Sequence, residues 1–113
     1  MSKEYTYSEA AELLRISNNT LHQWKTQGHI QYRKKQNRNI ITEDEIKNIT
    51  GLDKVEQLYT LKDLAAIFDL HPEKLREFAR IGELSFIRLL GSSKSLRIPE
   101  SEAKKFLEKK RVA

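Results

Sequence analysis

The stretch that decides the fold is ISNNTLHQWKTQG, residues 16–28. Ser17 has the side chain of a helix N-cap, and Gly28 suits the left-handed turn that often ends a helix. Between these ends only Leu21 and Trp24 are strongly apolar, so a single narrow face is held by the core. The sequence therefore predicts a short helix whose remaining surface is turned outward.

The outward face of this predicted helix is polar and carries no acidic side chain. Its members are Asn18, Asn19, His22, Gln23 and Thr26. Side chains of this kind hydrogen-bond the edges of bases, and the lack of carboxylates leaves nothing to repel phosphate. The same composition also fits an ordinary polar surface, so both interpretations stay open at this point.

The stretch occurs twice in the chain. A shift of fifty-four residues places Tyr5 on Tyr59, Ala11 on Ala65, Leu21 on Leu75, Trp24 on Phe78 and Gly28 on Gly82. After three extra residues in the second copy, Ile41 matches Ile98 and Glu43 matches Glu100. The chain is therefore a tandem duplication of one small unit. We expect a first unit at residues 1–51, a linker at 52–58 and a second unit at 59–113.

Two closely spaced helices begin each unit. Thr6 and Glu9 have the spacing of a capping box, which predicts a helix that ends near Arg15. Only Arg15 and Ile16 then precede the N-cap Ser17, and helices joined so tightly cross steeply, as in a helix-turn-helix.

A hairpin and a third helix complete each unit. In the first unit we expect strands at 29–33 and 39–41 around a basic tip at 34–38, then a helix capped by Thr42 and stopped by Gly51. In the second we expect a wing at 84–98 and a last helix at 99–111. The predicted fold class is mainly α with small β-hairpin wings, a tandem duplication of a winged helix-turn-helix unit.

Composition and charge narrow the class of protein. The chain of 113 residues has 21 basic and 16 acidic residues, a net charge of +5, which favours a polyanionic partner without requiring one. Without cysteine there is neither a disulfide framework nor a thiolate metal site. No long apolar run suggests a membrane span or a signal peptide, so we expect a cytoplasmic protein.

The pattern of the first repeat resembles a known superfamily. Tyr5-Thr6-x-x-Glu9-Ala10-Ala11-x-x-Leu14-x-Ile16-Ser17-x-x-Thr20-Leu21-x-x-Trp24-x-x-x-Gly28-x-Ile30, followed by a basic wing, resembles the winged helix-turn-helix of the MerR and phage excisionase superfamily. The resemblance covers the first repeat nearly end to end and the second more loosely. It implies DNA binding, with the second helix in the major groove and the wing on the backbone or minor groove. The chain lacks the long dimerisation helix and effector domain of MerR-type regulators, so it looks more like small excisionases and phage or plasmid regulators.

The resemblance and the positions of the basic residues together define the expected DNA-binding set. On the recognition helix these residues are Ser17, Asn18, Asn19, Thr20, His22, Gln23 and Lys25, and on the first wing Arg33, Lys34, Lys35 and Arg38. In the second repeat they are Lys74, Arg76, Arg80, Arg88, Lys94 and Arg97.

The two repeats differ in the charge of the presented helix. The second carries Glu73 and Glu77, which oppose phosphate unless they pair with Arg76 and Arg80 at i, i+3 spacing. Its wing is also less charged. We therefore hypothesise that the first repeat dominates DNA affinity, while the second reads an adjacent segment weakly or contacts a protein.

Several highlighted residues have a structural interpretation as well. Trp24 and Phe78 lie on the apolar stripe and are expected in the core rather than stacked on bases. For His22 a DNA contact is favoured over a metal ligand, because no second ligand stands at metal spacing. The run at 33–38 also fits an ordinary solvated hairpin tip. No nucleophile, paired-carboxylate or phosphate-loop pattern is present, so neither an enzyme nor a cofactor is expected.

The expected function is sequence-specific binding of double-stranded DNA by a protein of phage, plasmid or bacterial type, as a transcriptional regulator or an excision or recombination accessory factor. The alternative is an interaction adaptor, in phage packaging or plasmid maintenance, that uses the winged fold to bind protein. The expected partners are duplex DNA and a protein bound through the second repeat. No membrane is expected, and the chain would act as a monomer or a weak cooperative assembly on DNA.

Overall fold

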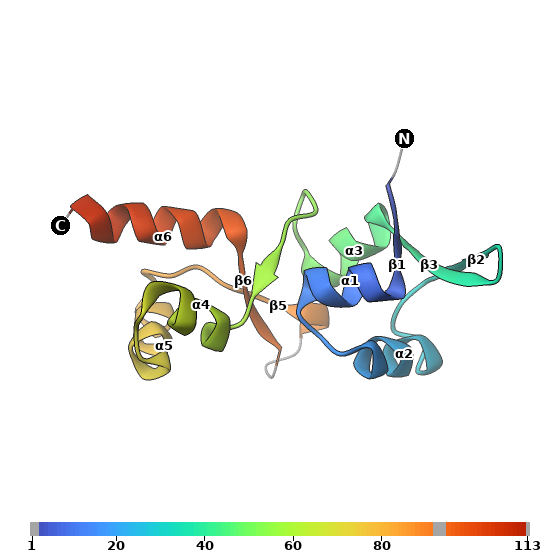
Figure 1. Ribbon diagram of the computed structural model, residues 1–113, viewed down its shortest axis with the longest axis horizontal. Helices are drawn as coiled ribbons and strands as arrows, with labels where there is room; N and C mark the ends of the chain where they lie inside the picture. Colours follow the sequence, from blue (N-terminus) through green and yellow to red (C-terminus); the bar gives the residue numbers. More distant parts are fainter. Residues whose placement is uncertain (1–2, 92–94, 113) are drawn as a thin grey trace. The chain divides into compact units, whose positions relative to one another are not determined.

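The computed structural model describes residues 3–91 and 95–112 and divides the chain into two compact units, Met1–Val55 and Glu56–Ala113. The first unit contains, in order, β1 (Glu4–Thr6), α1 (Tyr7–Leu14), α2 (Asn18–Thr26), β2 (Arg33–Lys35), β3 (Arg38–Thr42) and α3 (Glu43–Thr50) (Figure 1). Its strands form one antiparallel sheet in the order β1-β3-β2.

Capping side chains set the start of α1 as the sequence predicts. The backbone N–H of Glu9 donates to Thr6 Oγ1 at 3.1 Å, and the N–H of Thr6 donates to Glu9 Oε1 at 2.9 Å. The helix ends at Arg15, whose φ of 56° is left-handed, and this turn redirects the chain into α2. At the start of α3 the structure shows one half of the predicted capping box, the bond from the Glu45 N–H to Thr42 Oγ1.

The core of the first unit is aliphatic and draws on every helix. Leu14 of α1, Leu21 of α2, Ile41 of β3, and Ile46 and Ile49 of α3 are at most 1 % exposed. Full burial of such a side chain contributes about 1.5–3 kcal/mol relative to exposure. These contacts fix α2 by one face and leave the rest of its surface in solvent.

The strand β1 was not predicted. Tyr5 pairs with Ile41 in the sheet, and the N–H of Glu43 donates to the carbonyl of Lys3 at 2.9 Å. The strand β1 thus adds to the β3 side of the hairpin and connects the sheet directly to the start of α1. A strand of three residues is too short to show an alternating pattern in the sequence. Thr6 also serves both as the last residue of β1 and as the N-cap of α1.

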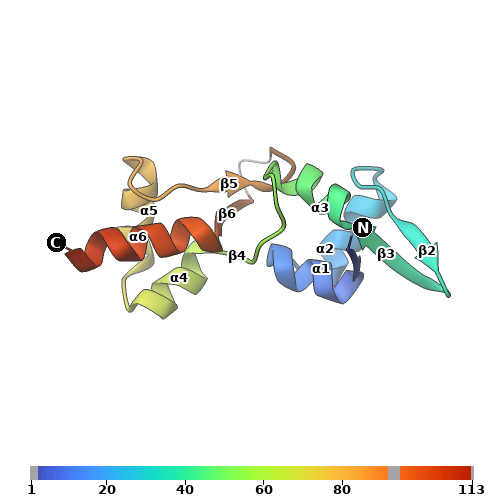
Figure 2. The ribbon, with the colours of Figure 1, turned by 90° about the horizontal axis from the view of Figure 1, so that it is seen from above.

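The hairpin of the first unit differs from the predicted one. Lys34, Lys35 and Arg38 were expected in a turn-rich tip, but they lie on paired strands, with Lys35 opposite Arg38. The turn contains only Gln36 and Asn37, both with positive φ (51° and 64°). Two consecutive residues with positive φ form the tight turn whose twist suits a β-hairpin, so the paired strands reach further toward the tip than composition suggests. At the other end the expected strand at 29–33 is wrong, because β2 begins only at Arg33 and residues 29–32 precede it. The hairpin projects beyond the helices in two perpendicular views (Figures 1 and 2).

The turn chemistry leads to a testable expectation. Asn-Gly is favoured in a two-residue turn with positive φ, whereas glutamine is strained there. The double substitution Gln36→Asn and Asn37→Gly should stabilise the first unit by about 1 kcal/mol. Chemical denaturation followed by circular dichroism checks this, and slower amide exchange at Lys35 and Arg38 should accompany it. Faster exchange at these amides would contradict the turn geometry.

The second unit repeats this architecture. It contains β4 (Leu58–Tyr59), α4 (Leu61–Phe68), α5 (Pro72–Arg80), β5 (Ile87–Arg88), a 3-10 turn (Leu89–Gly91), β6 (Leu96–Pro99) and α6 (Glu100–Val112), with sheet order β4-β6-β5. Its core adds an aromatic cluster, since the Phe106 ring lies 5.9 Å from that of Phe68 and 5.1 Å from that of Phe78. Each unit has the order helix, helix, hairpin, helix, and the predicted tandem of winged helix-turn-helix units is confirmed.

Two boundaries of the second unit differ from expectation. Leu58, assigned to the linker from sequence, is fully buried in β4 and pairs with Pro99. Pro99 was expected to begin the last helix but ends β6, and α6 begins at Glu100. The edge strand β4 accounts for both differences, because Leu58 of β4 pairs with Pro99 and so extends β6 by one residue. β4 adds to β6 in the second unit as β1 adds to β3 in the first.

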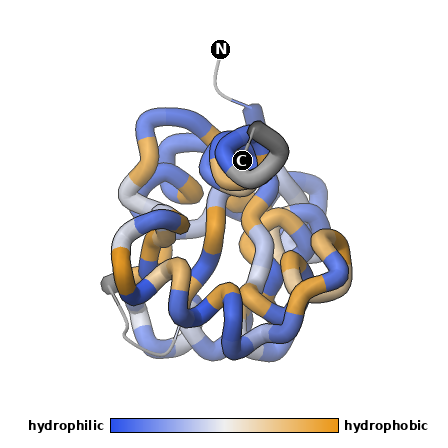
Figure 3. The backbone as a smooth tube through the Cα atoms, turned by 90° about the vertical axis from the view of Figure 1, so that its left-hand side faces the viewer, coloured by the Kyte–Doolittle hydropathy of each residue, from blue (hydrophilic) through white to orange (hydrophobic). Residues whose placement is uncertain are grey.

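Apolar residues are dispersed along the chain in short stretches interrupted by polar ones (Figure 3). This is the pattern of amphipathic elements that each bury one face. Within residues 3–91 and 95–112, no helix combines the length and the apolar character needed to cross a membrane.

Candidate nucleic-acid interface

Local hydrogen bonds shape both ends of α2. Ser17 Oγ accepts from the N–H of Thr20 at 3.0 Å and lies 2.9 Å from Thr20 Oγ1. At the other end the N–H groups of Gly28 and His29 donate to the carbonyls of Lys25 and Trp24, around a Gly28 φ of 78°. This paired arrangement is a Schellman motif, which ends the helix sharply. Of the residues predicted to contact DNA, Ser17 and Thr20 thus have hydroxyls already engaged in holding the helix.

The inner side of α2 carries Leu21, which is fully buried, and Trp24, which is only half-buried. Lys25 lies beside it and packs against two aromatic rings. Its Nζ is 4.8 Å from the ring centroid of Tyr32 and 6.0 Å from that of Tyr7. Such cation–π contacts contribute about 0.5–1 kcal/mol at exposed sites. Lys25, predicted as a DNA contact, therefore also joins the end of α2 to the base of the hairpin.

Tyr7 and Tyr32 are site residues that sequence reasoning missed. Burial raises the pKa of the Tyr7 phenol above its ordinary value, and the neighbouring Tyr32 raises it further. The Tyr7 phenol therefore stays neutral at physiological pH. The rings of Tyr7 and Tyr32 face the same ammonium group, that of Lys25. The sequence predicted Tyr32 in a strand, but it lies just before β2, and nothing in the sequence indicated its contact with Lys25.

Four side chains on the outer face of α2 are available for a ligand. Asn18, Asn19, His22 and Gln23 are exposed, and the described structure gives them no hydrogen-bond partner within the chain. Thr26, on the same face, donates its hydroxyl to the carbonyl of His22 at 3.0 Å. The groups without a described partner are three amides and one imidazole, so the face offers both hydrogen-bond donors and acceptors and carries no acidic side chain.

The hairpin adds positive charge. Arg33, Lys34 and Arg38 are exposed and have no described partner among residues 3–91 and 95–112. Lys35 Nζ lies 3.1 Å from Glu4 Oε1, and its side chain is 65 % exposed. An exposed pair of this kind contributes about 0–1 kcal/mol, so a phosphate can compete with Glu4 for the lysine. The structure thus brings the predicted wing cations together on one hairpin.

The helix α5 of the second unit is different. Arg76 Nη1 lies 2.8 Å from Glu73 Oε1, and Arg80 bonds Glu77 in the same i, i+3 arrangement. The pairing that the sequence suggested is therefore present. Lys74 Nζ lies 5.9 Å from the Phe78 ring centroid. The cations of α5 are locally balanced, unlike those of the first hairpin.

The second hairpin also presents less free charge. Arg88 packs over the Phe86 ring, with 5.0 Å from its Cζ to the ring centroid, and Arg97 Nη1 donates to the Leu96 carbonyl at 2.8 Å. Lys94, predicted as a DNA contact, lies outside the described residues. Leu89 is fully buried while Leu90 is 38 % exposed, so these two neighbouring leucines of the second wing do not form a contiguous exposed apolar patch.

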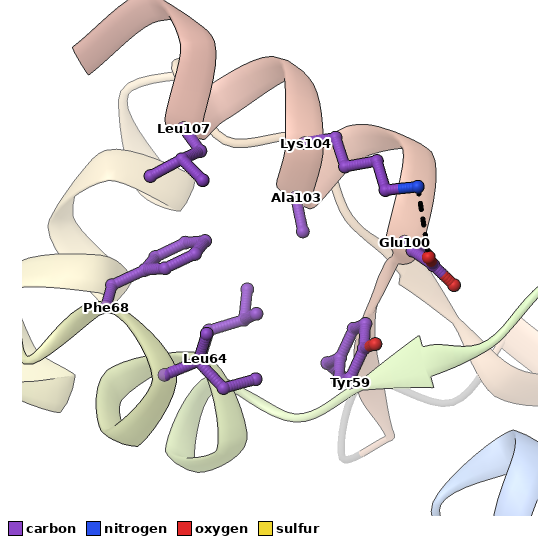
Figure 4. Close-up of a pocket in the computed structure, with 8 residues that line it drawn as sticks. Tyr59, Leu64, Phe68, Glu100, Ala103, Lys104 and Leu107 are labelled. Atoms are coloured by element: carbon purple, nitrogen blue, oxygen red, sulfur yellow. Dashed lines mark ion pairs between the residues drawn. The ribbon is translucent and has the colours of Figure 1, made fainter. Parts of the chain in front are cut away.

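An apolar groove between α4 and α6 is the second feature that sequence reasoning missed (Figure 4). It is a cavity of about 180 Å³ lined mainly by Leu64, Ile67, Phe68, Ala103 and Leu107. Ile67 is 60 % exposed and Leu107 41 % exposed. At its edge Lys104 Nζ lies 3.2 Å from Glu100 Oε1, the pair drawn in Figure 4.

The positions that line this groove carry different residues in the first unit. The residue matching Ala103 is Ile46, which is buried, and the residue matching Leu107 is Thr50, the last residue of α3. The helix α6 continues past this point to Val112. The groove is therefore a departure of the second unit from the shared plan, which the repeat alignment could have revealed.

The search for a metal site covers the described part of the chain. Within residues 3–91 and 95–112, no three histidine, aspartate or glutamate side chains lie close enough to hold a metal ion. His71 acts as the N-cap of α5, its Nδ1 accepting from the N–H of Glu73 at 3.2 Å.

Comparison with known proteins agrees with this geometry. The model of a helix-turn-helix domain family matches the chain twice, over residues 4–48 and 58–111. Curated proteins and solved structures gave no match. The two matches span both units, from the first edge strand to the last helix, and confirm the resemblance to excisionase-like helix-turn-helix domains. The protein therefore belongs to this DNA-binding helix-turn-helix domain family and carries two copies of the domain in tandem.

Proposed function

We propose that the chain binds double-stranded DNA sequence-specifically, as a transcriptional regulator or as an excision or recombination accessory factor. The observation that carries this proposal is the outer face of α2, where Asn18, Asn19, His22 and Gln23 are exposed and have no described partner. These groups match the donors and acceptors on base edges, and an α-helix fits the major groove.

The hairpin supplies the second part of the interface. Arg33, Lys34 and Arg38 contact the phosphate backbone in this proposal, and their charge provides affinity without sequence preference. Lys25, held between Tyr7 and Tyr32, keeps the hairpin base next to the end of α2. Base reading and backbone anchoring thus come from one unit.

The two units have unequal roles in this proposal. The first dominates affinity, because its wing cations Arg33, Lys34 and Arg38 have no described partner and its helix carries no acid. The second contributes a weaker contact, since Arg76 and Arg80 are already paired with Glu73 and Glu77. A covalent tandem still raises the effective concentration of the second unit beside the first binding site.

A salt titration tests the proposal. The full chain is titrated against a fluorescent pool of random-sequence duplexes at several salt concentrations, and the bound fraction is sequenced. We expect affinity to fall steeply with salt and a short motif to be enriched. Absence of binding at low salt would overturn the proposed function.

A second candidate function is that of an adaptor which binds a partner protein through the groove between α4 and α6. The groove favours it because Ile67 and Leu107 expose apolar surface there. Lys109 on α6 is exposed, and Lys104 and Lys105 form only exposed ion pairs, with Glu100 at 3.2 Å and Glu102 at 3.5 Å. Such pairs contribute little, so carboxylates that flank the aliphatic side chains of a partner segment can compete for these lysines. This role is compatible with DNA binding, because neither α5 nor the wing lines the groove.

Filling the groove tests the adaptor role. The double substitution Ala103→Ile and Leu107→Thr copies Ile46 and Thr50 of the first unit. Peptides selected against the full chain from a displayed random library should be acidic and aliphatic, and should lose at least about tenfold in affinity for this variant, about 1.4 kcal/mol.

The matched control is Ala66→Ile, which adds the same bulk to α4 at an exposed position outside the groove lining. It should leave peptide binding unchanged, and all three proteins should bind DNA equally. Selected peptides that bind the filled variant as tightly as the parent, or that lack acidic residues, would contradict this assignment.

A further inference from the structure

Resting on the proposed function, we infer that the first unit reads A·T base pairs. The outer face of α2 holds the amides of Asn18, Asn19 and Gln23 and the imidazole of His22, and nothing else that is both polar and without a described partner. The inference concerns which bases this set selects, beyond the fact of binding.

The argument begins with the matching of donors to acceptors. In the major groove adenine presents the N7 acceptor beside the N6 donor, whereas guanine presents two acceptors, N7 and O6. A side-chain amide has one carbonyl acceptor beside two N–H donors. It therefore satisfies both positions on adenine at once, but it places its oxygen against an acceptor of guanine.

The groups that select G·C pairs are absent from this face. Guanine is read by the two donors of arginine or lysine, and cytosine by a carboxylate. The helix α2 contains no arginine and no acid, and its one lysine, Lys25, packs against the rings of Tyr32 and Tyr7 at 4.8 and 6.0 Å. Nothing else on α2 offers paired cationic donors to O6 and N7.

The spacing of the amides suits two contacts. Asn19 and Gln23 are four residues apart, which on an α-helix is about 6 Å along the axis and on the same side. This separation is close to two base-pair steps of about 3.4 Å each. His22 donates to N7 of either purine and does not discriminate. Asn19 and Gln23 are therefore the specificity-determining residues that this inference assigns.

The second unit provides the contrast within the same chain. Its helix α5 presents Arg76 and Arg80, the guanine-reading type, and Glu73 and Glu77, the cytosine-reading type, bonded to each other in pairs. If each unit binds its own DNA segment, or half-site, the side chains of α5 give no reason for an adenine preference in the half-site of the second unit. The composition of the two half-sites should differ.

The test is selection of bound duplexes from a random pool by the full chain and by three variants. The parent should enrich a motif with adenine favoured over guanine by at least about fivefold at two positions, the lower bound for a bidentate contact. Gln23→Ala should flatten one of these positions, and Gln23→Arg should shift it to guanine. Gln27→Ala, which removes an exposed amide just beyond the helix, should leave the motif unchanged.

The outcomes separate this inference from the proposed function. Binding of duplexes with guanine or cytosine at the position that depends on Gln23, or a motif unchanged in both Gln23 variants, would overturn the inference alone. The slope of log affinity against log salt, measured in parallel, should be the same for the parent and Gln23→Ala. An equal slope shows that the variant is folded and still contacts the phosphate backbone of the DNA. Failure of the parent to bind any duplex would overturn the proposed function itself.

Discussion

Replacing Arg33, Lys34 and Arg38 by glutamine is expected to weaken DNA binding by two to three orders of magnitude at about 0.1 M salt. Each phosphate contact contributes about 0.9 to the slope of log affinity against log salt, so the loss of three contacts lowers the slope by about 2.7. The three side chains are exposed, and their replacement removes no described contact, so the fold should be unaffected. Fluorescence anisotropy across a range of salt concentrations measures both quantities.

A control with the same change in net charge makes this result specific. Lys54, Lys62 and Lys109 are exposed and lie outside both presented helices and both wings. Their replacement by glutamine should alter the slope little, because no phosphate contact is lost. At the matched wing positions, Lys34→Gln should cost more affinity than Arg88→Gln, since Arg88 is already packed over Phe86. Equal effects of the two triple variants would mean that only overall charge matters.

Truncation of a buried leucine should have the largest effect on stability. Leu21 is fully buried on the inner side of α2, and Leu21→Ala is expected to destabilise the first unit by about 2–5 kcal/mol. A unit of this size has only about 3–8 kcal/mol of stability, so much of its population should unfold. Leu75→Ala truncates the matching, fully buried leucine of α5 and should do the same to the second unit.

The pair of leucine variants also tests how function is divided. Thermal unfolding followed by circular dichroism should show an early transition in each variant. DNA affinity should collapse in Leu21→Ala and fall only modestly in Leu75→Ala, because the first unit carries the free cations and the reading helix. If Leu75→Ala reduced affinity as strongly, both units would be equal partners in DNA binding.

Helix ends could be predicted from sequence because they depend on local chemistry. The side chains of Thr6, Ser17 and Thr60 accept from N–H groups three residues away, and Gly28 follows the end of its helix with a left-handed φ. The spacing of these residues is visible in the sequence alone. The duplication then allowed the second unit to be inferred from the first.

The edge strands and the turn of the first hairpin could not be predicted in this way. Tyr5 pairs with Ile41, and Leu58 with Pro99, so each edge strand depends on a partner far along the chain. Gln36 and Asn37 form the turn although glutamine seldom adopts positive φ, and basic residues on both sides made the strands look like loop.

For the candidate site, the sequence predicted which side chains are exposed better than it predicted which of them lack a partner within the chain. Asn18, Asn19, His22 and Gln23 are exposed as expected, while Ser17 and Thr20 bond each other and Lys25 packs on two tyrosines. The capping role of Ser17 was visible in the sequence, whereas the packing of Lys25 depends on two tyrosines that only the folded chain brings near. The groove of the second unit likewise depends on a difference in side-chain volume between matched positions.

The most direct test of the account is to locate α2 on its DNA. The chain has no cysteine, so Asn19→Cys provides a single attachment point for a DNA-cleaving iron chelate. On a duplex carrying the selected motif, we predict strong cleavage confined to a few base pairs within the motif. Chelate attached through Asn48→Cys, at an exposed position of α3, should cleave there weakly or not at all. Equal cleavage from both positions, or cleavage spread evenly along the duplex, would contradict the placement of α2 in the major groove.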